Sequence, residues 1–382
     1  MAFSVDIGLD LFGDKIREPA ECIITVDGTT LDDLYPVLVS VQVSTSRAQA
    51  AAATLTFETR RLEDGSWNVQ DLDLLKPWAP IKIEAAFGER TEEVMRGFIL
   101  SVDADYPANP GQTTLTVTCQ DESLPLDRDH VREQWGADGP TSDGVIVTTI
   151  AGRHNLAPHG DNADGLQAVS LNQDDTDIKF LRERAEANGY ELIFSQGAIY
   201  FGPMRLSLAP QDNIMVYAGP DTNCINFNLT DDGHLPDAVA YDIAAREGEN
   251  TESETIEPDL ELLGTEPATS ADSGLGDFTW RLSRAGEATP EEAVARALAK
   301  ANENAMKIKA TGELDGALYG HVLRVGEPVG VDGIGQRYGG VYYVDTVDHV
   351  FDTSGYRQSF QLLRNAYGDN LEEAGGVLAG VL

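Results

Sequence analysis

Residues 340–366 read GVYYVDTVDHVFDTSGYRQSFQLLRNA, and the fold prediction starts from this stretch. Apolar and polar residues alternate on both sides of a turn at Gly355, which is typical of two β-strands that each bury one face. The stretch therefore predicts an antiparallel pair of strands near the end of the chain.

A similar skeleton occurs earlier in the chain. The later copy runs through Pro328-Val329-Gly330-Val331, Gly340, Val347-Asp348, Phe351, the turn at Gly355 and the strand SFQL. The earlier copy runs through Pro80-Ile81-Lys82-Ile83, Gly97, Val102-Asp103, Tyr106, a turn at Gly111 and the strand TLTV. Alternating strands and glycine turns recur by chance in any β protein. The other interpretation is a degenerate internal repeat, which predicts two related β-barrels, the second interrupted by residues 250–310.

Six segments between Glu21 and Cys119 alternate in the same way, which predicts a barrel or sandwich of short strands. They are CIITVDG, VLVSVQVS, AAATLTFETRR, PIKIEAAFG, MRGFILSVDADY and TTLTVTCQ. Strands return after Asn223, and we expect them in CINFNLT, DAVAYDIAA, HVLRV and EPVGVDG.

Two helices are predicted between residues 131 and 215. One begins near Ser142 and Asp143. The second begins at Asp175 or Thr176, places three apolar residues on one face (Ile178, Leu181 and Ala185), and ends at Gly189 as a left-handed cap. A hairpin follows, with its turn at Gln196 and Gly197.

A third helix is predicted from Thr289 to about Lys309. Thr289-Pro290-Glu291-Glu292 is a capping box with proline at the first helical position. The apolar face should contain Val294, Leu298, Ala301 and Ala305. Residues 247–277 hold ten acidic residues and no basic one, which is typical of a solvated, mobile insertion.

These patterns predict a mainly β protein with α+β insertions, in which two related β-barrel domains accompany smaller α/β domains. The predicted boundaries are 1–130 for the first barrel, 131–215 for an α+β domain, 216–249 with 311–367 for the second barrel, 250–310 for the acidic insertion and helix, and 368–382 for a flexible tail.

The composition excludes several classes of partner. The chain has 382 residues, with 64 Asp and Glu against 27 Lys and Arg, and a formal net charge of -37. Such a surplus repels phosphate backbones and anionic membranes, so we expect no specific nucleic-acid binding and no direct membrane insertion. The N-terminus carries no secretion signal, which predicts a protein made in the cytoplasm. Cys22, Cys119 and Cys224 are widely spaced and lack metal-finger partners, which predicts free, buried thiols.

No catalytic, cofactor-binding or metal-ligating residues are predicted. The sequence has no GxSxG motif and no HExxH motif, and the glycines of GVDGIGQRYGG lie between strands rather than at a phosphate-binding turn. The six histidines form no compact pair (His130, His154, His159, His234, His321 and His349).

Two acidic clusters invite a metal-site interpretation. The loop Gly160–Gly165 fails as an EF-hand because Gly160 and Leu171 occupy the first and twelfth ligand positions. Asp174, Asp175 and Asp177 precede a helix, where carboxylates cap the first turn and complement the helix dipole.

The order of these signatures resembles the baseplate hub family of contractile phage tails, the phage late control protein D family. It is also similar to the N-terminal part of type VI secretion spike proteins. The resemblance rests on FLRERAEANGYELIFSQGAIYFG and on the C-terminal strands that close with Arg364-Asn365-Ala366. It extends from about Ala20 to Ala366.

The resemblance implies a structural hub, with no enzyme activity and no cofactor, that trimerises into a pseudo-sixfold ring with an axial channel. Such a ring joins a hexameric tail tube to a trimeric spike. The implied partners are the tail tube protein, a separate spike protein, the tape-measure protein and other baseplate proteins, within a phage tail, tailocin or injection particle assembled in the cytoplasm. The acidic residues would then line the channel or cover the exterior, and the run at 247–277 favours the exterior.

Two other functions remain open at this point. One is a tail-associated hydrolase of cell-wall glycans, since 64 acids make close carboxylate pairs inevitable. The other is a secreted, acidic, calcium-dependent β-protein such as a lectin or adhesin.

Overall fold

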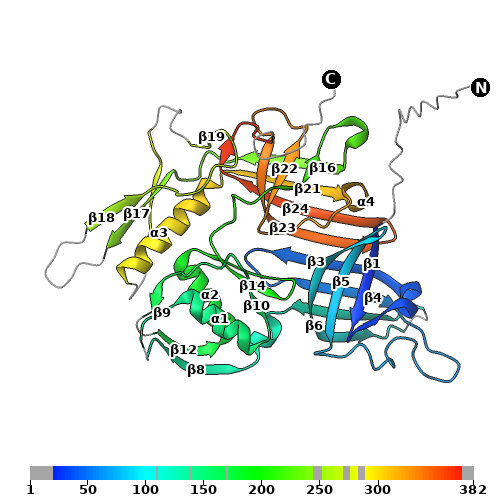
Figure 1. The fold of residues 1–382 in the computed structure, drawn as a ribbon. Helices are drawn as coiled ribbons and strands as arrows, with labels where there is room; N and C mark the ends of the chain where they lie inside the picture. Colours follow the sequence, from blue (N-terminus) through cyan, green and yellow to red (C-terminus); the bar gives the residue numbers. More distant parts are fainter. Residues whose placement is uncertain are drawn as a thin grey trace, which may run out of the picture.

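The computed structural model describes residues 20–108, 111–137, 139–168, 171–243, 252–269, 276–282 and 289–371. The fold is mainly β, as predicted, and its largest sheet curls like half of a barrel (Figure 1). Helices α1 and α2 lie beside this sheet with their own small strands. Helix α3 lies with β17 and β18 at the left of the view in Figure 1. Most of the predicted tail, residues 372–382, lies outside the described residues.

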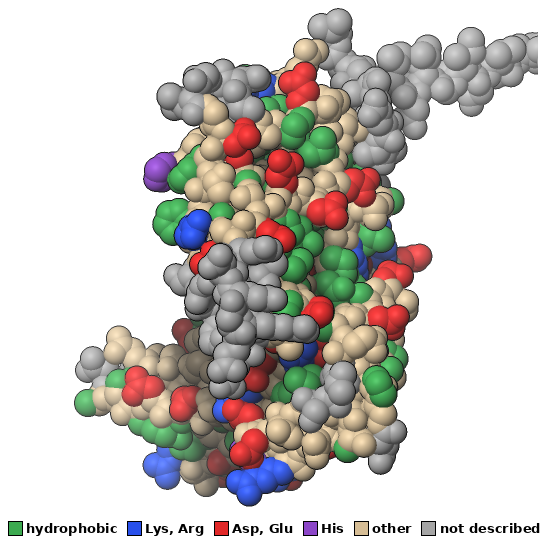
Figure 2. All heavy atoms as spheres, turned by 90° about the vertical axis from the view of Figure 1, so that its left-hand side faces the viewer, with side chains coloured by type: hydrophobic (Ala, Val, Ile, Leu, Met, Phe, Trp, Pro, Cys, Tyr) green, Lys and Arg blue, Asp and Glu red, His purple; other side chains and the backbone are tan. Residues whose placement is uncertain are grey.

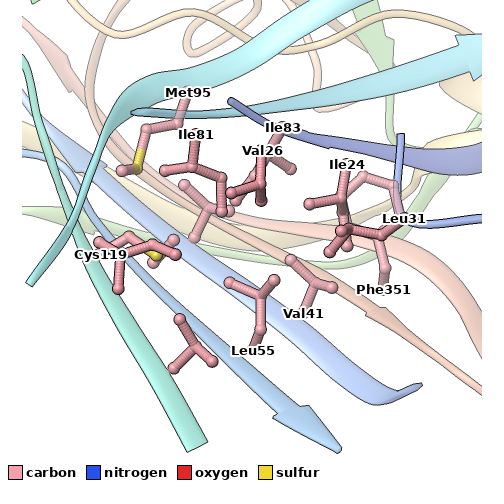
Figure 3. Close-up of a cluster of buried hydrophobic side chains, with 14 of the residues drawn as sticks. Ile24, Val26, Leu31, Val41, Leu55, Ile81, Ile83, Met95, Cys119 and Phe351 are labelled. Carbon is pink, nitrogen blue, oxygen red and sulfur yellow. The ribbon is translucent and has the colours of Figure 1, made fainter. Parts of the chain in front are cut away.

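The N-terminal part forms the six strands that the sequence predicts. They are β1 (Ala20–Val26), β3 (Leu38–Ser46), β4 (Ala52–Glu58), β5 (Pro80–Phe87), β6 (Arg90–Asp105) and β7 (Thr114–Asp121), with a short β2 (Thr29–Thr30). Alternate residues of these strands point into one core, where Figure 3 shows Ile24, Val41, Leu55, Ile83 and Cys119 together. Burial raises the pKa of Cys119 to about 12, so this thiol stays protonated.

The C-terminal part forms a second group of strands around its own core. They are β15 (Gln211–Met215), β16 (Cys224–Asp231), β21 (Ile308–Asp315), β22 (Pro328–Asp332), β23 (Gly340–Asp352) and β24 (Gly355–Arg364). The hairpin predicted at Gly355 is confirmed. The strand predicted in HVLRV is wrong. The Leu323 N–H donates to the side-chain oxygen of Gln358, and the Gln358 side-chain amide donates to the His321 carbonyl. These backbone groups bond a side chain rather than a strand, which fixes the segment as a buried loop.

The described residues show one continuous sheet and do not show the two predicted barrels as such. β3 pairs antiparallel with β23, so both groups of strands belong to one sheet of 13 strands in the described part of the chain. The pairing is possible because β22 covers only Gly340–Tyr343 of β23 and leaves the rest of that edge to β3.

The middle of the chain forms a small α+β region that contains both predicted helices. It contains β8 (His130–Trp135), β9 (Thr141–Ser142), α1 (Asp143–Arg153), β10 (Ala157–Pro158), β11 (Gln167–Ala168), β12 (Leu171–Thr176), α2 (Asp177–Asn188), β13 (Glu191–Ser195) and β14 (Ala198–Gly202). Thr176 is the N-cap of α2, and Gly189 ends it with φ 67°. Gln196 and Gly197 form the hairpin turn with positive φ, as predicted.

The third helix, α3 (Pro290–Ala305), begins with the predicted capping box. Its buried stripe differs from the prediction, because Ala297 and Ala301 face the core while Val294 is exposed. Small alanines let the helix pack closely on β17 (Ala238–Ile243), where Val239 and Tyr241 are buried. The helix ends before Lys309 because Lys307 pairs with Asp237 and the chain then enters β21.

The acidic stretch, expected to be mobile, is held in place over the residues that the structure describes. β18 (Glu252–Ile256) pairs with β17, and β19 (Glu266–Pro267) pairs with β25 (Ala366–Tyr367). The predicted closing motif explains the anchoring: Arg364 donates to the Leu263 carbonyl, and Asn365 bonds backbone groups of both Glu261 and Leu263. The rest of 247–277 lies outside the described residues.

Replacing Thr289 by alanine should weaken α3 by about 1 kcal/mol, because the Thr289 hydroxyl accepts the Glu292 N–H and the Glu292 carboxylate accepts the Thr289 N–H. Hydrogen exchange of the first turn of α3 measures the loss. Arg296→Ala, on the exposed side of the same helix, is the control. Equal protection in the two variants would show that the box contributes nothing.

Candidate assembly interface

Five strands of each part of the sheet pair in the same order. In the N-terminal unit the order is β3-β4-β7-β6-β5, and in the C-terminal unit it is β16-β21-β24-β23-β22. The chain visits both sets in the same sequence, from β3 to β7 and from β16 through β21 to β24. The internal similarity predicted from sequence therefore corresponds to two units of one topology.

Bulges occupy equivalent places in the two units. Leu100 of β6 and Asp345 of β23 are the extra residues, each two positions before the paired valine, Val102 or Val347. Val39 of β3 and Ile225 of β16 are a second matching pair. Bulges bend a strand and fix its register, so matched bulges give the two units matched curvature.

The register corrects the sequence alignment by two residues in two places. Val102 lies opposite Val117 and Val347 lies opposite Phe360, so TLTV corresponds to RQSF (residues 357–360), two residues before the predicted match SFQL. Likewise Gly97, opposite Ile81, corresponds to Tyr342 rather than Gly340. A shift of two keeps every side chain on its face, which is why the sequence pattern did not reveal it.

The two units meet where β3 lies beside β23. Val41 lies opposite Phe351 and Val43 lies opposite His349, and all four side chains are buried. In Figure 3 Phe351 lies beside Val41 within the N-terminal core. Phe351 also stacks on Tyr356, with 4.1 Å between the ring centres. The C-terminal unit thus completes the core of the N-terminal unit.

A polar cluster fixes this junction to the α+β region. Arg47, directly after β3, pairs with Asp345, the bulged residue of β23, and with Glu191 of β13 at 3.3 Å. The Tyr343 hydroxyl donates to the second oxygen of Glu191 at 2.7 Å. Burial raises the pKa of Glu191, while the Arg47 guanidinium acts in the opposite direction. Arg47 is therefore the cation shared by all three parts.

His349 lies at the centre of the junction with its ring 2.9 Å from the Tyr356 hydroxyl. Burial lowers the pKa of His349 to about 3, so the ring is neutral in the folded protein. The unfolded chain protonates this histidine near its ordinary value of about 6.5, so folding releases the proton below that pH. The stability supplied by this site is thus present above pH 6.5 and declines as the pH falls toward 3.

We expect the native protein to lose about 2 kcal/mol at this site between pH 7 and pH 4.5. A His349→Gln variant lacks this proton uptake, so the stability difference between native and variant should shrink by that amount. Urea unfolding at both pH values measures it. His234→Gln, at an exposed position, is the control. An unchanged difference would contradict the assignment.

Three of the histidines lie apart from one another, each beside its own carboxylate partners. His130 bonds Asp174, His154 bonds Asp177, and His321 lies between Glu92 and Asp212. In the described part of the chain, no group of three or more His, Cys, Asp or Glu side chains is placed to hold a metal ion. The predicted side-chain cap of α2 is wrong: the N-cap Thr176 makes no capping bond, and Asp174 pairs with His130 and Arg132 instead. Asp175 accepts the Thr176 N–H, and Asp177 lies in the first turn of α2, where a carboxylate complements the helix dipole.

One buried cluster was not found by sequence reasoning. Asp143 accepts two bonds from Arg184, at 2.8 and 3.2 Å, and a third from Asn188, while Arg184 also reaches Glu292 at 3.2 Å. The cluster ties α1, α2 and α3 together. Arg184 lies one position before Ala185, on the edge of the apolar face, where long polar side chains are usually assigned to solvent.

A cavity of about 520 Å³ lies where the three parts meet. Its lining includes arginines, acids and two histidines (Arg96, Glu122, His159, Arg205, Arg324 and His349). Both histidines of this cavity already have partners in the protein. The His349 ring bonds the Tyr356 hydroxyl. The His159 ring packs edge-on against Tyr200, and its Nδ1 accepts the Asp161 N–H. The cavity therefore has the character of a polar seam between packed parts.

Acidic side chains are spread over the face shown in Figure 2, and the few Lys and Arg there gather mainly near its lower end. No described helix has the length and apolar character needed to cross a bilayer.

The fold is that of tail and secretion-system proteins. A 43 kDa prophage tail protein of Shewanella oneidensis has a TM-score of 0.67 at 14% identity, over 90% of this chain and 98% of that one. A tail protein of Neisseria meningitidis has a TM-score of 0.60 at 12% identity, over 91% and 96%. An Escherichia coli type VI secretion component, similar to the T4 tail proteins gp27 and gp5, has a TM-score of 0.54 at 11% identity, over 90% and 78%.

The model of a sequence family, described as the Alg8 N-terminal domain, matches residues 17–352. Because the match spans most of the chain, the chain belongs to the Alg8 N-terminal domain family. This description names a domain and no reaction, and the motifs of the sequence did not predict it. No curated protein matches the chain in sequence. The resemblance to the late control protein D family stays a prediction.

Proposed function

We propose that this chain is a structural hub of a contractile tail or a related injection particle. It forms a homotrimer in which two similar units per chain make a ring of six. That ring seats the hexameric tail tube on one side and a trimeric spike on the other, around an axial channel. The observation that carries the proposal is the duplicated unit, joined head to tail by β3 and β23 in a fold shared with tail proteins.

The symmetry of the proposed particle explains why the chain would contain two similar units. A sixfold tube and a threefold spike share an axis but not a repeat, so a protein between them must present six similar contacts on one side and three on the other. One chain with two related units meets both requirements when three copies surround the axis. The spike is a separate protein in this proposal.

The domain division proposed for the hub keeps the predicted boundary of the first unit, residues 1–130, and moves the others to the ends of strands. β15 and β21 pair within the second group of strands, so the α+β domain ends before Gln211 and the second unit takes residues 211–237 and 308–367. Separate hydrophobic clusters support three of these parts. Residues 238–307 form an addition to the second unit through β17, β18, α3 and the segment held by Arg364.

The hub acts by assembly rather than by catalysis. The net charge of -37 repels DNA and other anionic cargo, so a polymer passing along the axis would not adhere. The same charge on the exterior would keep the particle hydrated. A negative potential along the axis of a trimer would assign the charge to the channel, and a neutral or positive one would assign it to the exterior.

A bridging assay tests the proposal. Purified chain, tail tube protein and spike protein of the same particle are mixed in pairs and together, and complexes are separated by sedimentation. We expect the chain to bind each partner and to be required for tube and spike to sediment together. Absence of binding to both partners, or turnover of peptidoglycan by the chain alone, would contradict a structural hub.

A further inference from the structure

Two of the edges of the sheet that lack a strand partner among the described residues lie on β16 and on the end of β6. β16 pairs with β21 alone and so ends the sheet. On β6, the partner β5 reaches only to Phe98, so residues 100–105 pair with β7 on one side and leave the other side open. In Figure 1 the β16 edge lies in the upper part of the molecule and β6 in the lower part.

These edges are the counterparts of the two strands that already pair within the chain. The bulges place β16 where β3 lies in the other unit, with Phe227 at the position of Val41 and Leu229 at that of Val43. They place the end of β6 where β23 lies, with Val102 at the position of Val347 and Tyr106 at that of Phe351.

The equivalent side chains differ in exposure. Phe351 is 7% exposed at the internal junction, whereas its counterpart Tyr106 is 55% exposed. Val41 and Val43 are fully buried, whereas Phe227 and Leu229 are only partly buried. The open edges thus carry apolar residues at positions that the internal junction covers. An open strand edge with apolar residues is a ready site for pairing with another strand.

We propose that β16 of one copy pairs antiparallel with the end of β6 in the next copy, repeating the β3–β23 contact between chains. Transfer of the internal register places Phe227 opposite Tyr106, Leu229 opposite Ala104 and Asp231 opposite Val102. This deepens the proposed hub, since it names the surface through which copies join, and it rests on that proposal for the ring that results.

We assign a second copy of the chain to the open edges because the chain already contains the same kind of contact, between β3 and β23. The internal junction is head-to-tail: one unit offers the β3 edge and the other accepts it on β23. The same contact repeated between chains uses different surfaces on each partner, and such heterologous contacts close into rings. A different protein would have to imitate β3 in both register and bulge.

The contact between chains differs from the internal one in charge. The ion pair of Arg47 with Asp345 has no equivalent, because Gly233 and Leu100 occupy those positions. Asp103, Asp105 and Asp231 instead lie along the open edges. Like charges across a contact repel, and salt screens them, so association of copies should strengthen as salt concentration rises.

Disulfide cross-linking tests the register. Asp103 and Thr230 are exposed and lie opposite each other in the proposed pairing, within the span of a disulfide between adjacent strands. An Asp103→Cys, Thr230→Cys variant should form covalent oligomers on mild oxidation. The control carries Asp103→Cys with Thr311→Cys, an exposed position one strand further from the contact. Both variants also carry Cys224→Ser.

The expected result is cross-linking of the first variant and at least tenfold less in the control. Oligomers that form without a cross-link at 103 and 230, or equal cross-linking of both variants, would overturn the pairing while leaving the hub itself open to the bridging assay. A chain that stays monomeric throughout would also overturn it.

A single substitution provides an independent measurement. Tyr106→Asp should weaken association by about tenfold, because it places a charge where the internal contact has Phe351. Tyr217→Asp, at a tyrosine that is 88% exposed and lies outside both strands, is the matched control. Equal association of the two variants would contradict the role of this edge.

Discussion

An Arg364→Met variant should lose about 3 to 5 kcal/mol of folding free energy. Arg364 is fully buried, and its guanidinium donates to three carbonyl oxygens: Leu263 at 3.1 Å, Tyr338 at 2.6 Å and Gly368 at 2.6 Å. Methionine fills similar space but donates nothing, so three carbonyl oxygens lose their donor, that of Leu263 in a buried position. The guanidinium also lies over the Tyr342 ring, 5.0 Å from its centre, and this contact is lost as well.

The control for this prediction lies on the same strand. Arg357 is largely exposed and pairs with Glu313 at 3.3 Å, so Arg357→Met should cost less than about 1 kcal/mol. Urea unfolding followed by tryptophan fluorescence measures both variants. Hydrogen exchange at Leu263 and Gly368 then locates the loss. A similar cost for the two substitutions would show that the buried arginine is no more important than a surface one.

An Arg47→Met variant should lose about 3 kcal/mol at pH 7.5, because it leaves Glu191 and Asp345 without their shared cation. Glu191 is buried, so without Arg47 its pKa rises further above that of the unfolded chain. The folded variant then binds a proton more readily than the unfolded chain. The cost should therefore shrink as the pH falls from 7.5 to 5.

Removal of the Glu191 charge provides the control for Arg47. Adding Glu191→Gln to Arg47→Met should recover part of the stability at pH 7.5 and abolish most of the pH dependence of the cost. Unfolding of the single and double variants at the two pH values measures both effects. A cost for Arg47→Met that does not change with pH would contradict an ion pair with Glu191 as its origin.

The local structure was largely predictable from sequence where short-range rules decide it. The caps at Thr289 and Gly189, the turn at Gln196 and Gly197, and the alternating strands all depend on neighbours within a few residues. The internal repeat was also visible, because Pro80 and Pro328 start equivalent strands.

The remainder depends on contacts that sequence patterns do not encode. The pairing of Val41 with Phe351 joins strands about 300 residues apart, so alternation predicted both strands but not their partnership. Leu323 fits a strand pattern, yet its N–H bonds the Gln358 side chain. The acidic segment around Leu263 has a disordered composition but is held by Arg364 from the far end of the chain. Each of these outcomes is decided by a distant partner.

Single-particle averaging of the assembled chain, with its mass determined on the same sample, tests the central claim most directly. The account predicts three copies around one axis and, at moderate resolution, a ring of six similar densities, because each copy contributes two units of one strand order. A closed assembly with any other number of copies, or three copies whose two units lie at clearly different radii, would contradict a symmetry adaptor.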